Sequence, residues 1–287
     1  MKKESFLQIR ELDKTLQLHN DGQLTVFPVG TGSAFTKKNY QNNYILIKGD
    51  KHIMIDCGTR APEALYQLGH AVTDIKNFLI THSHADHIGG LEEAILLGRY
   101  VKKQKPHIVI TPKYEKLLWN DSLKGGSAWN ESKKHGYLGF DDFFVPHRPK
   151  KYRGLDRDAW EIDYEGFNLI IFRTMHYPDN SESWKDSAFS TGLIIDKKVL
   201  FSGDTRFDRS MVETITSRFP IEYIFHDVQF FPGGVHAPFD ELKTLAPEIK
   251  AKTILMHYPD NYLDYSDTIS DEGFHSFVKA HTYYDFF

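Results

Sequence analysis

The chain has 287 residues, of which 40% are hydrophobic and 14% aromatic, and its formal net charge is −4 at pH 7. This is enough to bury a substantial core in one domain. The single cysteine excludes an internal disulfide framework, and no apolar run is long enough to cross a membrane. Met1–Lys14 has no apolar h-region, which predicts no signal peptide, so we expect a cytoplasmic protein without a membrane partner.

The first part of the chain alternates short strands with helices, which predicts an α/β layered protein. The predicted elements are a strand at Leu24–Val29, a hairpin of Tyr44–Lys48 and His52–Ile55, and a helix at Ala61–Leu68. Gly30–Ala34 lacks the Lys-Ser/Thr of a phosphate loop, and we interpret it as a tight structural turn. Asp56 ends the second hairpin strand, and Cys57 beside it is expected to be a small buried residue.

Metal-binding residue types cluster at the next strand end. Phe78–Ile80 predicts a buried strand and Leu91–Tyr100 a helix, and between them lies Thr81-His82-Ser83-His84-Ala85-Asp86-His87. One histidine alone is more often a surface or core residue than a ligand, but clustered imidazoles bring no packing advantage. Imidazoles and a carboxylate at this spacing suit zinc, iron or manganese, so the motif predicts a metal site.

Residues 112–158 look like an insertion, rich in Lys, Gly, Asp and aromatic residues without sustained periodicity. Residues 102–157 carry 13 Lys and Arg against 6 Asp and Glu. One interpretation is a surface excursion with its own apolar cluster. The other is a lid or substrate arm whose positive charge attracts anions. Aromatic residues interleaved with Lys also suit base stacking, a weaker signal here because Gly125-Gly126 and acidic residues interrupt the pattern.

Strands of the second half repeatedly stop at a His or an Asp. The pairs are Phe167–Phe172 before His176, the hairpin of Ala188–Ile195 and Val199–Phe201 before Asp204, Tyr223–Phe225 before His226 and Asp227, and Thr253–Met256 before His257. We expect these polar residues to converge at one edge of the core.

The sequence Met175-His176-Tyr177-Pro178-Asp179-Asn180 recurs without change at 256–261. One explanation is a shared turn in which Pro-Asp-Asn ends each strand. The other is that both halves present equivalent His ligands, steadied by the neighbouring Tyr. The two explanations are compatible, because a ligand has to be held by a rigid turn.

The motif at 81–90, with its strand before and Gly89-Gly90 after, resembles the metallo-β-lactamase superfamily. The resemblance implies a four-layer αββα sandwich of two mixed β-sheets flanked by helices, in a single domain over 1–287 with 112–158 as an insertion or lid. It also implies two divalent metals, zinc first, with iron as the alternative and manganese as a third choice. The ligands it implies are His82, His84 and His176 for one metal, Asp86, His87 and His257 for the other, and a bridging Asp204, with Asp56 orienting metal-ligating histidines.

Within the superfamily the chain is most similar to the ribonuclease Z and phosphodiesterase branch. The similarity rests on Gly30–Ala34 and on His226-Asp227-Val228-Gln229 followed by His236, where that branch has His-Glu-Ala-Thr and a later histidine. It implies a hydrolase in which a metal-bridging hydroxide attacks a phosphodiester or another anionic ester, Asp86 or Asp204 steers the proton, and His236, held by Asp227, is the general acid. The substrate would be a small anion or a short nucleic acid. The Val-Gln departure argues against tRNA processing.

The alternative is a non-hydrolytic diiron protein that binds O2 as an oxygen or redox sensor and acts on a signalling partner protein. The same fold carries diiron centres, and a chain rich in aromatic residues could form a dry pocket for O2. An electron-transferring reductase fits less well, because the flavodiiron proteins usually have Glu at the place of His84. The aromatic segment His275–Phe287 leaves two alternatives open, packing on the core and packing on a partner chain in a homodimer.

Overall fold

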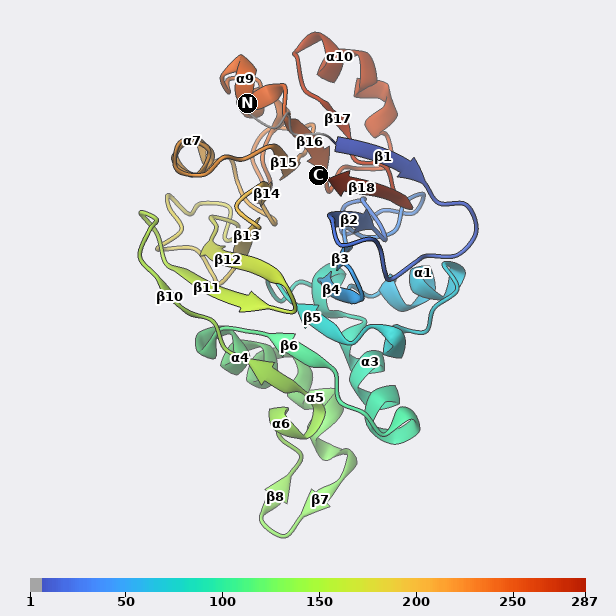
Figure 1. Ribbon diagram of the computed structural model, residues 1–287. Helices are drawn as coiled ribbons and strands as arrows, with labels where there is room; N and C mark the ends of the chain where they lie inside the picture. Colours follow the sequence, from blue (N-terminus) through green and yellow to red (C-terminus); the bar gives the residue numbers. More distant parts are fainter. Residues whose placement is uncertain (1–6) are drawn as a thin grey trace. The chain divides into compact units, whose positions relative to one another are not determined.

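The computed structural model describes residues 7–287 (Figure 1). Part of the stretch in which we expect no signal peptide, residues 1–6, lies outside the described residues. The chain divides into two compact units, each built on one eight-stranded sheet. Unit 1 comprises residues 7–30, 40–149 and 280–287, and unit 2 comprises 31–39 and 150–279. Within residues 7–287, no helix combines the length and the apolar character that crossing a bilayer requires.

The sheet of unit 1 has the strand order β1-β18-β2-β3-β4-β5-β6-β9. Pairing is antiparallel from β1 to β4 and parallel from β4 to β9. The predicted hairpin is present as β3–β4, and its turn contains Gly49, whose φ of 59° is the left-handed value that two-residue hairpin turns favour. The strands are β1 (Leu7–Glu11), β2 (Leu24–Pro28), β3 (Tyr44–Lys48), β4 (Lys51–Ile55), β5 (Asn77–Leu79), β6 (His107–Val109), β9 (Val145–His147) and β18 (Thr282–Phe286).

The longer helices of unit 1 bury an apolar face, as α3 illustrates. In α3 this face is Leu91, Ala94 and Ile95, at the i, i+3, i+4 spacing of an amphipathic helix. The predicted helix over Leu91–Tyr100 ends as an α-helix at Leu97 and continues as the π-helix η2. The helices are α1 (Ala61–Gln67), η1 (Val72–Asp74), α2 (Ala85–Ile88), α3 (Leu91–Leu97), η2 (Gly98–Lys102), α4 (Pro112–Leu117), η3 (Leu118–Leu123), α5 (Lys124–Ser127), η4 (Ala128–Asn130) and α6 (Phe140–Phe143).

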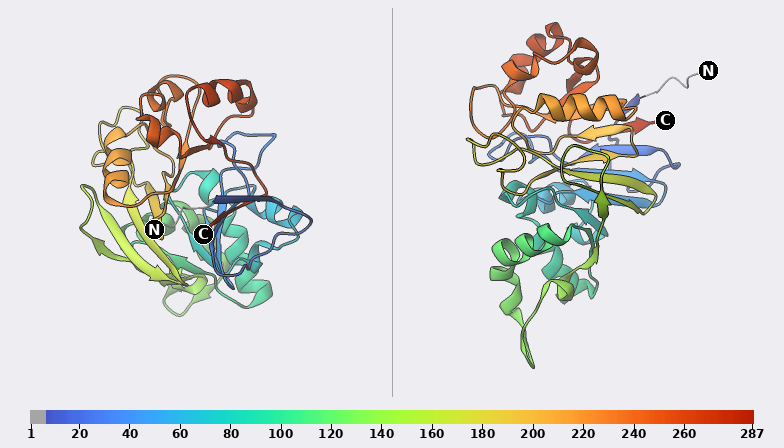
Figure 2. Two further views of the ribbon diagram at one scale, coloured as in Figure 1. Left: turned by 45° about the horizontal axis from the view of Figure 1, so that its top comes forward. Right: turned by 90° about the vertical axis from the view of Figure 1, so that its left-hand side faces the viewer.

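The stretch 112–158 has more regular structure than its composition suggests. Strands β9 and β10 (Lys150–Tyr152) belong to the large sheets, and the longest part of the stretch outside them is residues 112–144. The hairpin of β7 (Ser132–Lys133) and β8 (Gly136–Tyr137) extends away from α5 and α6 (Figure 2). The ring of Trp119 lies 6.2 Å from that of Phe140 and 5.9 Å from that of Phe143, so these aromatic residues form the apolar cluster of one interpretation. A role as a lid stays a prediction.

The sheet of unit 2 has the order β10-β11-β12-β13-β14-β15-β16-β17, antiparallel up to β14 and parallel from there. Two large mixed sheets flanked by helices confirm the predicted α/β class. The strands from β11 on are β11 (Ala159–Tyr164), β12 (Phe167–Arg173), β13 (Thr191–Ile195), β14 (Val199–Phe201), β15 (Tyr223–Asp227), β16 (Thr253–Met256) and β17 (Ser276–Phe277). The helices are α7 (Arg209–Arg218), α8 (Phe239–Leu242), α9 (Pro247–Lys250), η5 (Tyr262–Tyr265) and α10 (Ser266–Asp271).

Helix α7 lies along this sheet, and its Met211, Val212 and Ile215 belong to the same buried cluster as Leu200 and Ile224 of the strands (Figure 2). Its N-cap is Asp208, whose carboxylate accepts a hydrogen bond from the backbone N–H of Met211 at 2.9 Å. The helix ends before Phe219-Pro220, because a residue that precedes proline is driven out of the helical region. Sequence signals at both ends therefore set the bounds of α7.

Replacing Asp208 by Ala is expected to lower the free energy of unfolding by about 3 kcal/mol, because the carboxylate also pairs with the buried Arg157 at 3.0 Å. Burial raises the pKa of Asp208, but the charge of Arg157 and the hydrogen bonds outweigh it and hold the pKa below its usual value. A lowered folded pKa means that this stability is present above the unfolded pKa and is lost as the pH falls through the folded one.

Urea unfolding at pH 7 and at a series of acidic pH values measures this effect. The difference in the free energy of unfolding between wild type and Asp208→Ala should become smaller toward low pH. The exposed Asp264→Ala serves as the control. If the urea midpoint of Asp208→Ala at pH 7 equals that of wild type, the pair of Asp208 and Arg157 does not stabilise the fold.

Candidate metal centre

The histidine motif of unit 1 lies where predicted, between β5 and the one-turn helix α2. Asp86 and His87 lie in α2 and are buried, and His84 is its N-cap. The strand end at Asp56 packs directly on this helix, because the backbone N–H of Cys57 donates to the carbonyl of His87 at 2.7 Å. A Cβ on Gly58 would lie 2.0 Å from the carbonyl oxygen of Asp86, so only glycine permits this approach.

Asp56 orients two of the histidines. Its Oδ2 accepts hydrogen bonds from Nδ1 of His87 at 2.7 Å and from the hydroxyl of Thr81 at 2.8 Å. The Thr81 hydroxyl donates its one hydrogen bond to Asp56. Its oxygen therefore accepts a hydrogen bond from Nδ1 of His82, 3.1 Å away. The Nε2 atoms of both histidines therefore carry a lone pair. Burial raises the pKa of Asp56, against the lowering effect of His87 and Thr81.

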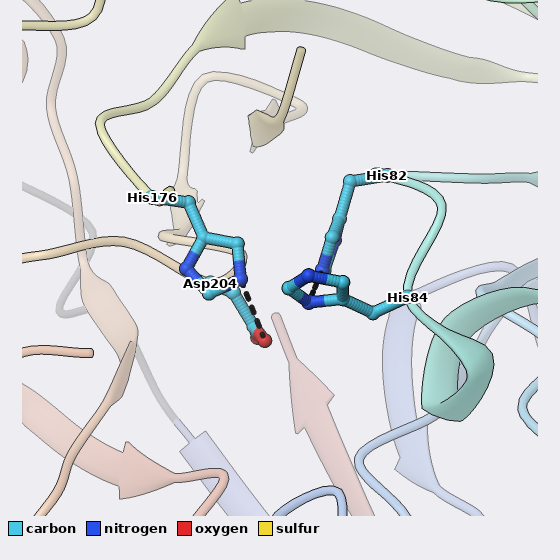
Figure 3. A group of neighbouring side chains, drawn as sticks. All are labelled: His82, His84, His176 and Asp204. Carbon is cyan, nitrogen blue, oxygen red and sulfur yellow. Dashed lines mark hydrogen bonds and ion pairs between the residues drawn. The ribbon is translucent and has the colours of Figure 1, made fainter. Parts of the chain in front are cut away.

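These lone pairs lie close to further ring-nitrogen and carboxylate atoms of unit 1. Nε2 of His82 lies 3.0 Å from Nδ1 of His84 (Figure 3), and Nε2 of His87 lies 3.2 Å from Oδ2 of Asp86. A lone pair directed at a carboxylate oxygen in a buried place is unfavourable unless a proton or a cation lies between them. Imidazole nitrogen and carboxylate oxygen are ligands that zinc, iron and manganese accept. The donor set of unit 1 therefore fits a divalent metal.

Unit 2 brings its candidate residues together at one sheet edge. Strands β14, β15 and β16 are parallel neighbours, so Asp204, Asp227 and His257, at or just past their ends, meet at that edge. His176 follows the antiparallel β12. Its Nε2 lies 3.8 Å from Oδ2 of Asp204 (Figure 3), and Nε2 of His257 lies 3.3 Å from the same oxygen. The predicted convergence is thus present within unit 2.

A backbone carbonyl determines the tautomer of His176. Its Nδ1 lies 2.7 Å from the oxygen of Val235, and a carbonyl oxygen only accepts, so Nδ1 carries the proton. The Nε2 that faces Asp204 is then a lone pair directed at a carboxylate, as in unit 1. Fixing a ligand's tautomer through its second nitrogen is usual for metal-binding histidines. The donor set of unit 2 also fits a divalent cation.

Asp227 and His236 form a second pair in unit 2. Nδ1 of His236 lies 3.0 Å from Oδ2 of Asp227, and both residues lie with Asp204 in a group whose ligand atoms are within 4.8 Å of one another. Asp227 is fully buried. This burial raises its pKa, but hydrogen bonds from His226 and His236 outweigh it and hold the pKa below its usual value. The contact is the one that the resemblance implied, while its catalytic role stays a prediction.

Comparison with known proteins identifies the family. The profile of the family described as "Anti-Pycsar protein Apyc1" matches residues 24–284, which include every candidate ligand. The chain belongs to this family. An anti-Pycsar protein Apyc1 of Bacillus phage vB_BsuM-Goe3 is 36% identical over 241 residues, which cover 81% of this chain and 88% of the relative. An anti-Pycsar protein Apyc1 of Paenibacillus xerothermodurans is 32% identical over 269 residues, which cover 92% of this chain and 98% of the relative.

Solved structures similar to this Apyc1-family chain show that it has the metallo-β-lactamase fold. The metallo-β-lactamase fold protein YhfI from Bacillus subtilis has a TM-score of 0.63 at 15% identity, covering 90% of this chain and 97% of its own. A diphosphatase from the PhnP family has a TM-score of 0.65 at 16% identity, covering 91% and 97%. The short form of human tRNase Z has a TM-score of 0.56 at 17% identity, covering 89% and 96%. The predicted metallo-β-lactamase fold is confirmed.

Sequence reasoning missed two groups of this Apyc1-family site. Thr81 connects Asp56 to His82, and the carbonyl of Val235 holds His176. A hydroxyl next to the first motif histidine is a weak signal for the former. No signal exists for the latter, because every residue has a carbonyl.

The two copies of the repeat both end a strand with a histidine, but the turns differ. The ring of Tyr177 stands edge-on to that of His176, with centroids 5.0 Å apart. In the second copy the hydroxyl of the buried Tyr258 lies 2.6 Å from the carbonyl of Val278, and Asp260 accepts a hydrogen bond from the N–H of Lys37 at 2.7 Å. The glycine turn itself contacts this strand end through Ser33, whose backbone N–H donates to the carbonyl of Tyr258 at 3.0 Å, as expected of a structural turn. Cys57 is buried, as expected, and burial raises the pKa of its thiol.

Proposed function

We propose that this protein is a dinuclear-metal hydrolase that cleaves a phosphodiester or another anionic ester. The observation that carries the proposal is the pair of oriented lone pairs, one in each unit: Nε2 of His87 faces Asp86 in unit 1, and Nε2 of His176 faces Asp204 in unit 2. Nε2 of His257 lies 3.3 Å from the same oxygen of Asp204. Each set alone has the donors for a divalent cation, and the family's fold supports their use together.

In this proposal the two sets share two metals. His82, His84 and His176 would hold one metal, Asp86, His87 and His257 would hold the other, and Asp204 would be a ligand of both. Zinc is the first choice, with iron as the alternative and manganese as the third. Two divalent metals, when bound, lower the pKa of a shared water to near neutrality and stabilise the developing anion.

The chain's own residues orient the ligands and move the protons. Asp56 and Thr81 hold the rings of unit 1, and the carbonyl of Val235 holds His176. Asp86 or Asp204 steers the proton of the nucleophile. Asp227 binds Nδ1 of His236, so the other ring nitrogen is left to give a proton to the leaving oxygen. His236 is 20% exposed, so a substrate can reach it.

An anionic substrate, either a small molecule or a short nucleic acid, is supported by the basic surplus over residues 102–157. It also agrees with the names of similar proteins, since one solved neighbour is a diphosphatase and another a tRNase Z. The curated relatives are anti-Pycsar proteins, and we propose that this chain shares the action which that name states.

Metal removal tests the function. We expect the purified protein to hold two metal ions per chain by mass spectrometry and to hydrolyse bis(p-nitrophenyl) phosphate. A chelator should abolish turnover, and zinc or manganese should restore it. An oligonucleotide and a small phosphodiester, offered in parallel, decide the size of the substrate. Two irons, an absorption band that changes in air and no hydrolysis would instead favour the oxygen-binding alternative.

A further inference from the structure

We propose that Gln229 is a positioning residue. Its side-chain amide holds the loop of residues 230–236 so that one metal ligand and the general acid are oriented together. The inference rests on the proposed function and extends it, since Gln229 is one of the three residues at which this chain departs from the His-Glu-Ala-Thr segment of the ribonuclease Z branch.

The loop leaves unit 2's sheet after β15 and returns at α8. Its base is closed by the backbone of Gln229, whose N–H donates to the carbonyl of Ala237 and whose carbonyl accepts from the N–H of Phe239, both at 2.9 Å. Gly233 and Gly234 in its middle both have a φ of 75°, in the left-handed region. Consecutive glycines have the widest choice of backbone conformations, so a loop that contains them needs a contact that selects one.

The Gln229 side chain supplies that contact. It is 4% exposed, and its Nε2 donates to the carbonyl of Phe231 at 2.9 Å and to the carbonyl of Gly233. A carbonyl oxygen only accepts hydrogen bonds. The end of the Gln229 amide that faces two carbonyl oxygens is therefore the NH2 group. The Oε1 lies on the other side, where a Cβ on Gly234 would meet it at 3.2 Å. The four-residue reach to Gly233 needs a side chain of this length. The threonine of the related segment is two atoms shorter.

The positions that this contact controls are Val235 and His236, next to the glycine pair. The carbonyl of Val235 accepts from Nδ1 of His176 at 2.7 Å, and Nδ1 of His236 binds Asp227 at 3.0 Å. The ring of His236 lies beside those of both unit 2 histidine ligands, with centroids 5.0 Å from His176 and 4.4 Å from His257. A loop that relaxes would therefore misplace the ligand's orienting carbonyl and the acid at once.

Two near-isosteric substitutions test the role. Gln229→Met removes both hydrogen bonds, and Gln229→Glu places a carboxylate against the two carbonyl oxygens. For each we expect kcat to fall about 10–100-fold with KM within about twofold, and zinc affinity in a chelator competition to weaken by a similar factor, as for other groups that orient metal ligands. The exposed Gln67→Glu is the matched control and should keep wild-type values. Circular dichroism and thermal melting show whether each variant is folded.

Combination with His236→Ala separates positioning from a general loss of structure. If Gln229 acts on kcat partly through His236, Gln229→Met should cost less kcat in that background than in wild type. Folded Met and Glu variants with wild-type kcat and zinc affinity would overturn the proposal. A wild-type protein that hydrolyses no phosphodiester would contradict the proposed function instead, and the zinc competition would still decide the role of Gln229.

Discussion

Asp204→Asn is expected to remove nearly all hydrolytic activity, lowering kcat by about 10³-fold or more. Oδ2 of Asp204 is the atom on which Nε2 of both His176 and His257 converge, at 3.8 and 3.3 Å. Asparagine keeps the size but is neutral and leaves a single oxygen as a ligand. Loss of the carboxylate should cost several kcal/mol of transition-state stabilisation, which corresponds to this factor.

Metal content and turnover should be measured on the same sample. We expect the Asp204→Asn protein to hold fewer than two metals per chain, and an excess of zinc in the assay to restore little activity. The exposed Asp264→Asn controls for the change of charge alone. A variant that keeps two metals and the wild-type kcat would exclude Asp204 as a bridging ligand.

His236→Ala is expected to lower kcat by about 10²–10⁴-fold while both metals stay bound. The ring is held by Asp227, and the rings of His176 and His257 lie beside it. A general acid matters most when the leaving oxygen is a strong base. The loss should therefore be larger for a phosphodiester with an alkyl leaving group than for one that releases p-nitrophenolate, which leaves readily without a proton.

This dependence on the leaving group separates acid catalysis from damage to the metal centre. Damage would lower turnover of both substrates equally and reduce metal content. The exposed His275→Ala is the control and should behave as wild type. Equal losses for both leaving groups, with metal content intact, would remove the assigned role of His236.

Local patterns in the sequence were sufficient for the motif, the strand ends and the hairpins. Residues His82 to His87 lie on one strand-to-helix turn, as their spacing predicted. The apolar runs before His176, Asp204 and His257 are strands, as expected. These features depend on near neighbours along the chain, so pattern and turn chemistry identify them. They also carry the resemblance that predicted the metallo-β-lactamase fold, which the solved structures confirm.

The tertiary structure alone decided how the ligands are held. Strands β14, β15 and β16 are parallel neighbours, Asp56 determines the tautomer of His87, and the carbonyl of Val235 determines that of His176. Each of these features follows from contacts between segments far apart in sequence. Strands β9 and β10, within the predicted insertion, join the large sheets for the same reason, because pairing partners depend on strand order rather than on composition. Carbonyl groups occur at every residue, so a sequence cannot mark the one that a histidine uses; only the folded backbone selects it.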